Sequence, residues 1–183
     1  MEFDSKYNPG EVFSCIALNG VSPGFLENIS FNDVHITFPG GGTLEQGAKR
    51  DVPRIADEYF RNGVLPAYAL YARGVRGLTL NNVRFTMSAP DLRPAVIFDN
   101  VTDAAVSGLN VQADKGAESA LRFIDSQDVY LSATRLLSPA TVFAQVEGAG
   151  NSNITFDGGD LSKASKPVVF KNEARKKMVK LRM

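Results

Sequence analysis

Two aspartates at matching positions of an internal repeat are the residues in this 183-residue sequence that could do acid–base chemistry. Asp103 and Asp128 are 25 residues apart. If consecutive repeats stack as neighbouring strands do, the carboxylates lie about 4.8 Å apart, and such a pair can hold one proton with one raised pKa. Asn28 and Asn153 occupy the same place in other repeats. Because Asn and Asp both suit turns, we interpret this column as structural corners and predict no catalytic residue.

The remaining reactive residue types are sparse. The single histidine, His35, alternates outward between Val34 and Ile36, which predicts an exposed surface residue. The lone Cys15 lies in an apolar stretch, which favours a buried thiol. No Cys, His and Asp cluster has metal-ligand spacing, and the Gly run 40–42 lacks the Lys-Ser/Thr of a phosphate loop. We therefore predict no metal and no cofactor.

One segment, from Pro39 to Pro66, interrupts the repeat and is rich in charged and aromatic side chains. Aromatic faces stack on sugar rings, and guanidinium forks hold hydroxyls or carboxylates, so this insertion suits sugar recognition. A solvated loop packed on the side of the repeat is the alternative. The candidate substrate contacts are Arg50, Arg54, Asp57, Glu58, Tyr59 and Arg61 in the insertion, and Tyr68, Tyr71 and Arg73, which follow it and can anchor it.

The elements that position these side chains are short strands that recur about every 25 residues. Residues 28–31, 77–80, 103–106, 128–131 and 153–156 each begin with Asn, Asp or Gly and then alternate apolar with small or polar side chains. A second strand follows after a two-residue break, and a third precedes most units. Such a period predicts a solenoid, because no unit can bury its apolar face alone.

Three short strands per turn predict an all-β fold, a right-handed parallel β-helix of about six coils in one domain, residues 1–183. A β-sandwich could use the same strands, but its hairpins would not keep Asp103, Asp128 and Asn153 in phase.

The two ends of the chain differ. Lys and Arg crowd residues 174–183, which predicts an end cap, since charged edge strands discourage aggregation; a polyanion-binding tail is the alternative. No comparable cap precedes the first coil, which predicts end-to-end stacking or a larger parent protein.

Composition excludes several classes of partner. Zero net charge and a pI near 6.6 argue against nucleic-acid binding, and no apolar run is long enough to span a membrane. No signal peptide is recognisable at the start, so the localisation is not defined by these residues.

Four motifs resemble the C-terminal third of bacterial glycoside hydrolase family 28 proteins, the polygalacturonase-like enzymes of pectin breakdown. They are residues 38–43, 65–73, 75–80 and 93–95. The resemblance implies a parallel β-helix, an extracellular or periplasmic location, a pectic polysaccharide partner and inverting hydrolysis of glycosidic bonds.

The family's catalytic motifs are missing from this sequence. They are Asn-Thr-Asp, an Asp-Asp pair, Gly-His-Gly and a substrate-binding Arg-Ile-Lys, and none of the four occurs here. The insertion also departs from the family pattern at Asn62, and its acidic motif survives only as Glu58. After the insertion, Gly74 replaces a histidine that is common in the family. We therefore expect the C-terminal portion of such a hydrolase, inactive alone. The alternatives are a stand-alone carbohydrate-binding or structural β-helix, or a lyase-like enzyme, whose acidic calcium site is not visible.

Overall fold

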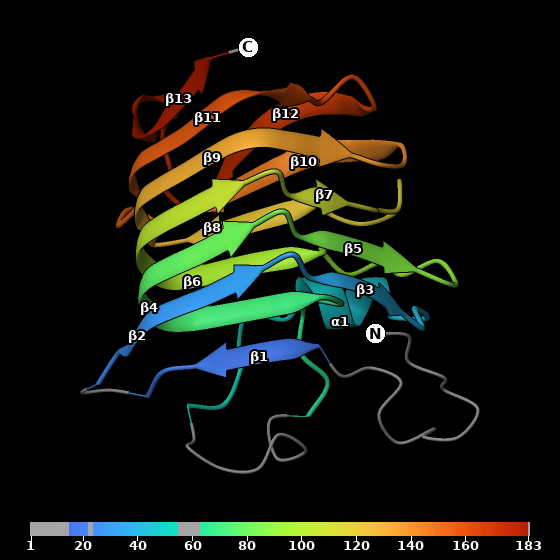
Figure 1. Ribbon diagram of the computed structural model, residues 1–183, viewed down its shortest axis with the longest axis horizontal. Coiled ribbons are helices and arrows are strands. Elements are labelled where there is room, and N and C mark those ends of the chain that lie inside the picture. Colours follow the sequence, from blue (N-terminus) through green and yellow to red (C-terminus); the bar gives the residue numbers. More distant parts are fainter. Residues whose placement is uncertain (1–14, 22–23, 55–62, 183) are drawn as a thin grey trace.

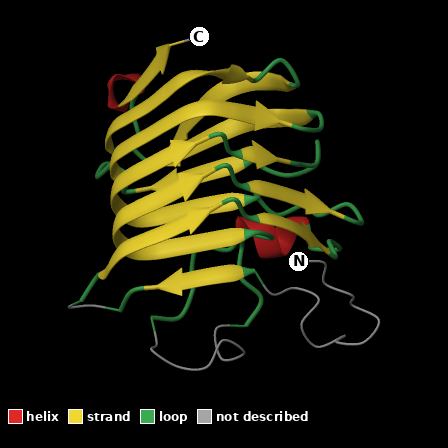
Figure 2. Cartoon of the chain, in the orientation of Figure 1, coloured by secondary structure: helices red, strands yellow, loops and turns green. Residues whose placement is uncertain are grey.

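The chain folds as a parallel β-helix, as the repeat predicts, with about five turns where about six were expected (Figures 1 and 2). The computed structural model describes residues 15–21, 24–54 and 63–182. Every strand pairing is parallel. The strands are β1 (Ile16–Asn19), β2 (Leu26–Asn32), β3 (His35–Phe38), β4 (Leu70–Asn81), β5 (Arg84–Met87), β6 (Val96–Ser107), β7 (Asn110–Val111), β8 (Leu121–Ile124), β9 (Gln127–Leu136), β10 (Ala140–Glu147), β11 (Ser152–Asp160), β12 (Ala164–Lys171) and β13 (Val179–Arg182).

Each turn of the helix contributes to three faces. The first face contains β1, β8, β10, β12 and the first halves of β4 and β6, in the register Ile16, Leu70, Val96 and Leu121. The second face contains β2, β13, the later halves of β4 and β6, and the first parts of β9 and β11. The third contains β3, β5, β7 and the ends of β9 and β11.

The corner between the second and third faces is built from residues in the left-handed backbone region. Asn82 and Gly108 lie there with φ of 51° and 66°, and Asp33, Ala133 and Gly158 hold the same place in their coils. Gly, Asn and Asp adopt this conformation at the lowest cost, which explains most of the column.

The corner before the second face uses the same backbone conformation five residues earlier in every coil. Its residues, Asn28, Gly77, Asp103, Asp128 and Asn153, have φ between 51° and 72°. The Asn153 side-chain amide donates to Asp128 Oδ1 at 2.8 Å. The interpretation of this column as structural corners is confirmed.

Inward-facing side chains fill the solenoid with one apolar core. Phe98, Phe123 and Phe156 pack edge to face through consecutive coils, with ring centroids 5.4 and 5.8 Å apart. Parallel pairing puts Phe98 and Phe123 in register, whereas Phe156 pairs with Leu131 and contacts Phe123 from the second face. The core therefore fixes the coils without disulfides in the described chain.

The last strand, β13, lies on β11 after a 3₁₀ helix over Lys176–Met178 (Figure 1). Its exposed Lys180 donates to Asn153 Oδ1 at 3.1 Å, and Arg182 lies 3.5 Å from Asp157 Oδ2. In the described residues, no helix is long and apolar enough to cross a membrane.

Candidate functional site

The outer surface of the first face is covered by the insertion. Along this surface the side chains of Tyr71, Ile97, Arg122 and Gln145 follow one another in register, and none is more than 2% exposed. The insertion contains a short helix, α1 (Leu44–Ala48), which begins at a capping box of Thr43 and Gln46. Polar side chains on this face are therefore placed under the insertion and not at an open groove.

The root of the insertion is held by a buried ion pair. Arg93 donates to both carboxylate oxygens of Asp91, at 2.9 Å from Nε and 2.7 Å from Nη2. Asp91 also accepts from the Gly42 amide at 2.9 Å, and Arg93 Nη1 donates to the Leu65 and Ala67 carbonyls at 3.3 Å. A Cβ on Gly42 would lie 2.2 Å from Arg93 Nε, so only glycine fits. This contact joins both ends of the insertion to one turn.

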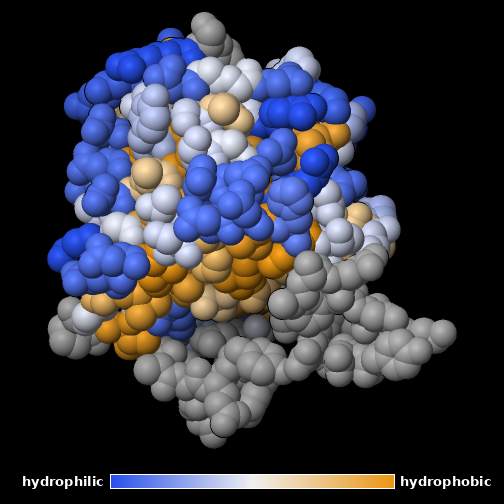
Figure 3. All heavy atoms as spheres, in the orientation of Figure 1, coloured by the Kyte–Doolittle hydropathy of each residue, from blue (hydrophilic) through white to orange (hydrophobic). Residues whose placement is uncertain are grey.

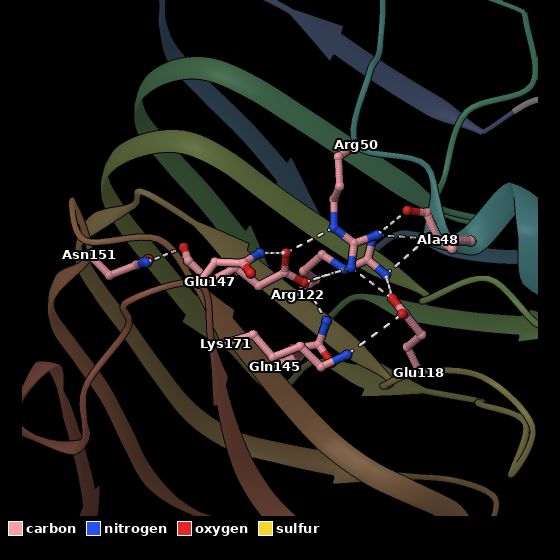
Figure 4. A network of polar contacts seen from close by, with 10 residues as sticks. Ala48, Arg50, Glu118, Arg122, Gln145, Glu147, Asn151 and Lys171 are labelled. Carbon is pink, nitrogen blue, oxygen red and sulfur yellow. Dashed lines mark hydrogen bonds and ion pairs between the residues drawn. The ribbon is translucent and has the colours of Figure 1, made fainter.

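The middle of the insertion is held by a network of charges (Figure 4). Arg50 donates to Glu147 Oε2 at 2.8 Å and Oε1 at 2.7 Å, and to Glu118 Oε2 at 2.8 Å. Arg122 lies between the same two carboxylates, 2.5 Å from Glu118 and 3.4 Å from Glu147. It also donates to the Gly47 carbonyl at 2.9 Å, so sheet and insertion share the network.

The network keeps its carboxylates ionised. Burial alone would raise the pKa of Glu147, but hydrogen bonds from Arg50 and Gln145 together with nearby guanidinium charge hold that pKa below its usual range. The pKa of Glu118 is lowered in the same way, against partial burial, by Arg50 and Arg122. Burial and the neighbouring charge of Arg50 lower the pKa of Arg122 to about 10. Such carboxylates are not proton donors at neutral pH.

Arg73 joins another part of the insertion, Val52 and Pro53, to β4. Its Nη1 donates to the Val52 carbonyl at 2.8 Å, and its Nη2 donates to the Pro53 carbonyl at 2.5 Å. Asn19 Oδ1 accepts from Nε and Nη2 at 2.9 and 2.7 Å. The expectation that Arg73 anchors the insertion is confirmed.

Next to Arg73 lies a polar pocket of about 140 Å³ at the corner after the first face. The guanidinium-bearing residues Arg54 and Arg73 line it, together with Asn100 and the partly exposed Phe25. Phe25 precedes β2, in the lower coils, where apolar side chains reach the surface (Figure 3). Arg76 lies over the Phe25 ring, 4.6 Å from its centroid.

Two of the residues that line the pocket are corner glycines. Gly20 and Gly74 precede Asn100 and Asp125 in the corner column of successive coils. A Cβ on Gly20 would lie 2.2 Å from the Gly74 carbonyl oxygen, so the two chains approach too closely for a side chain. The two glycines therefore let the backbones of neighbouring coils approach closely beside the pocket that Asn100 and Arg54 border.

The structure separates the predicted substrate contacts into three groups. Arg54 and Arg73 meet at the pocket, whereas Arg50 is engaged by Glu118 and Glu147. Tyr68 is completely buried and donates to the Gln112 carbonyl at 2.6 Å, and Tyr71, 2% exposed, donates to Asp99 Oδ2 at 2.8 Å. The other candidates, Asp57, Glu58, Tyr59 and Arg61, lie outside the described residues.

The remaining reactive residues do not form a site. His35 is exposed, as expected. Burial raises the pKa of the Cys15 thiol to about 12, which opposes formation of a thiolate. Over residues 15–21, 24–54 and 63–182, no group of three His, Cys, Asp or Glu residues could hold a metal ion.

Sequence reasoning missed the partners of the insertion. Glu118, Arg122 and Glu147 appear as ordinary charges in or beside strands, and their only signal is that Arg122 interrupts an apolar strand. Asn19 borders a corner, and nothing in the sequence marks it as part of a site. The alternation of apolar and polar residues within one coil does not show which loop packs over that coil.

No family model matches the chain, and no curated protein or solved structure is significantly similar to it.

Proposed function

We propose that this chain is the C-terminal β-helix portion of a polygalacturonase-like glycoside hydrolase that acts on pectic polysaccharide. It supplies stability and part of the binding surface and has no acid–base pair of its own. The observation that supports the proposal best is that the carboxylates under the insertion, those of Asp91, Glu118 and Glu147, are each bound by arginine.

Inverting hydrolysis needs one protonated carboxyl and one carboxylate about 6.5–9.5 Å apart, with space for water between them. Asp103 and Asp128 are the repeating pair, and both form backbone corners. Asp128 also accepts a hydrogen bond from Asn153. These roles support a scaffold and not a pair of proton-transfer groups.

The proposal is tested by the coding sequence immediately upstream of Met1. We expect it to encode further β-helix coils that carry the paired carboxylates this chain lacks. Expression of both parts together should then give polygalacturonate hydrolysis. An upstream region without such coils would overturn the proposal.

The alternative is a stand-alone carbohydrate-binding or structural β-helix, and the pocket at Arg54 favours the binding form of it. Polymer binding by the isolated chain, with no catalytic coils encoded nearby, would support this second function.

A further inference from the structure

We propose that the corner pocket between Arg54 and Asn100 binds the carboxylate of an acidic sugar, with Arg54 as the charged contact. The inference rests on the proposed function, because it names the substrate class that this surface would hold: a uronate residue of an acidic polysaccharide.

The first argument is uncompensated positive charge. Arg73 is 5% exposed, and its hydrogen bonds to Asn19, Val52 and Pro53 all go to neutral oxygens. Arg54 is exposed and lines the same pocket. In the part of the chain that the structure describes, neither guanidinium forms an ion pair with a carboxylate. Because a buried charge is costly without an opposite charge nearby, an anion in the pocket would be attracted by both arginines.

Asp99, which interacts electrostatically with both arginines, supplies at most one negative charge against their two positive charges. Asp99 follows Arg73 in the strand register, and one of its carboxylate oxygens accepts from Tyr71. Burial raises the pKa of Asp99, against the opposing effects of Tyr71, Arg73 and Arg54. Among the described residues it forms no ion pair with either guanidinium.

The second argument is the shape and chemistry of the walls. The Asn100 amide lines the pocket and can donate to or accept from a hydroxyl. Phe25 offers an aromatic surface for a sugar ring. Arg54 supplies a planar fork that matches a carboxylate in two hydrogen bonds. About 140 Å³ suits one sugar unit or part of one and not a longer oligomer.

The test compares charged and neutral forms of one ligand. The full chain is titrated by calorimetry with trigalacturonate and with its fully methyl-esterified form. We expect the acid to bind and the ester to bind at least about tenfold more weakly, since charge-assisted hydrogen bonds are the stronger ones. Arg54→Ala should weaken acid binding about tenfold and abolish the preference over the ester, while Arg54→Lys should retain part of it.

The matched control is Arg84→Ala, an exposed arginine on β5 that does not line this pocket. It should bind the acid as the unmodified chain does. No binding of the acid, equal binding of acid and ester, or equal weakening by Arg84→Ala and Arg54→Ala would each overturn the inference. None of these results bears on the upstream coding sequence, so the proposed function would stand or fall separately.

Discussion

Arg93 binds Asp91 through two hydrogen bonds of 2.9 and 2.7 Å, and both side chains are at most 1% exposed. The two residues are only two positions apart, yet the pair joins Gly42 at the start of the insertion to Leu65 and Ala67 at its end. The ion pair therefore holds both ends of the insertion at one point on the β-helix.

Replacement of Asp91 by Asn should be strongly destabilising. It deprives the buried Arg93 guanidinium of its carboxylate, and loss of one partner of a buried pair costs about 3 kcal/mol or more. Urea unfolding followed by circular dichroism measures this, because the chain has no tryptophan. The exposed Asp51→Asn is the control and should change little. Equal effects of the two substitutions would contradict the assigned role.

Substitutions of Glu147 and Arg122, under the insertion, should change the stability of the fold by different amounts. Glu147→Gln leaves Arg50 and Arg122 to share the Glu118 carboxylate, so we expect a loss of about 2 kcal/mol. Arg122→Met removes the poorly solvated cation and keeps the Arg50 ion pairs, so it should be nearly neutral or stabilising. Thermal unfolding at pH 7 ranks the two. A larger loss for Arg122→Met would refute this account of the network.

Stability should fall in acid through the same network. The pKa values of Glu118 and Glu147 are lowered by folding, so their contribution is present above their unfolded pKa and is lost as pH falls through the folded one. Urea midpoints at pH 7, 5, 4 and 3 should therefore drop mainly below about pH 4.5. Glu147→Gln should flatten this decline, and an unchanged slope in that variant would count against the mechanism.

Asp99→Asn should stabilise the protein at neutral pH. Burial raises the pKa of Asp99, so its stabilising form is the protonated one, and that contribution is lost as pH rises through the folded pKa. Asn cannot ionise and still accepts from the Tyr71 hydroxyl. We expect the melting temperature to rise by about 2 °C at pH 7 and not at pH 3. The control is Asp103→Asn at an exposed corner, where no such gain is expected.

Ala133 occupies a corner with φ of 50°, where the same column elsewhere has Asn, Asp or Gly. Ala133→Gly should therefore stabilise by about 0.5–1 kcal/mol, because an L side chain is strained in this region. The matched control is Ala105→Gly, an equally exposed alanine inside β6, where glycine should destabilise by a similar amount. Destabilisation at both positions would show that the corner is not strained.

The sequence predicts the coil and not what covers it. Corner residues such as Asn28 and Asp103 can be recognised in the sequence, because few residue types adopt the left-handed backbone region. Since the coils stack, these residue types recur at the same position of each repeat. Pairing of Arg50 with Glu147 joins residues 97 positions apart and follows from where the insertion crosses the sheet. The periodicity does not show where the insertion crosses the sheet. The sequence therefore predicts Arg50 and Arg54 equally as substrate contacts.

The central claim, that this chain provides scaffold and binding surface and no catalysis of its own, is tested most directly by reducing-sugar release from polygalacturonate and rhamnogalacturonan. The purified chain and its Asp103→Asn and Asp128→Asn variants are assayed together. The account predicts no release from any of the three. Release by the unmodified chain that either substitution abolishes would contradict it and would place an active site in the corner column.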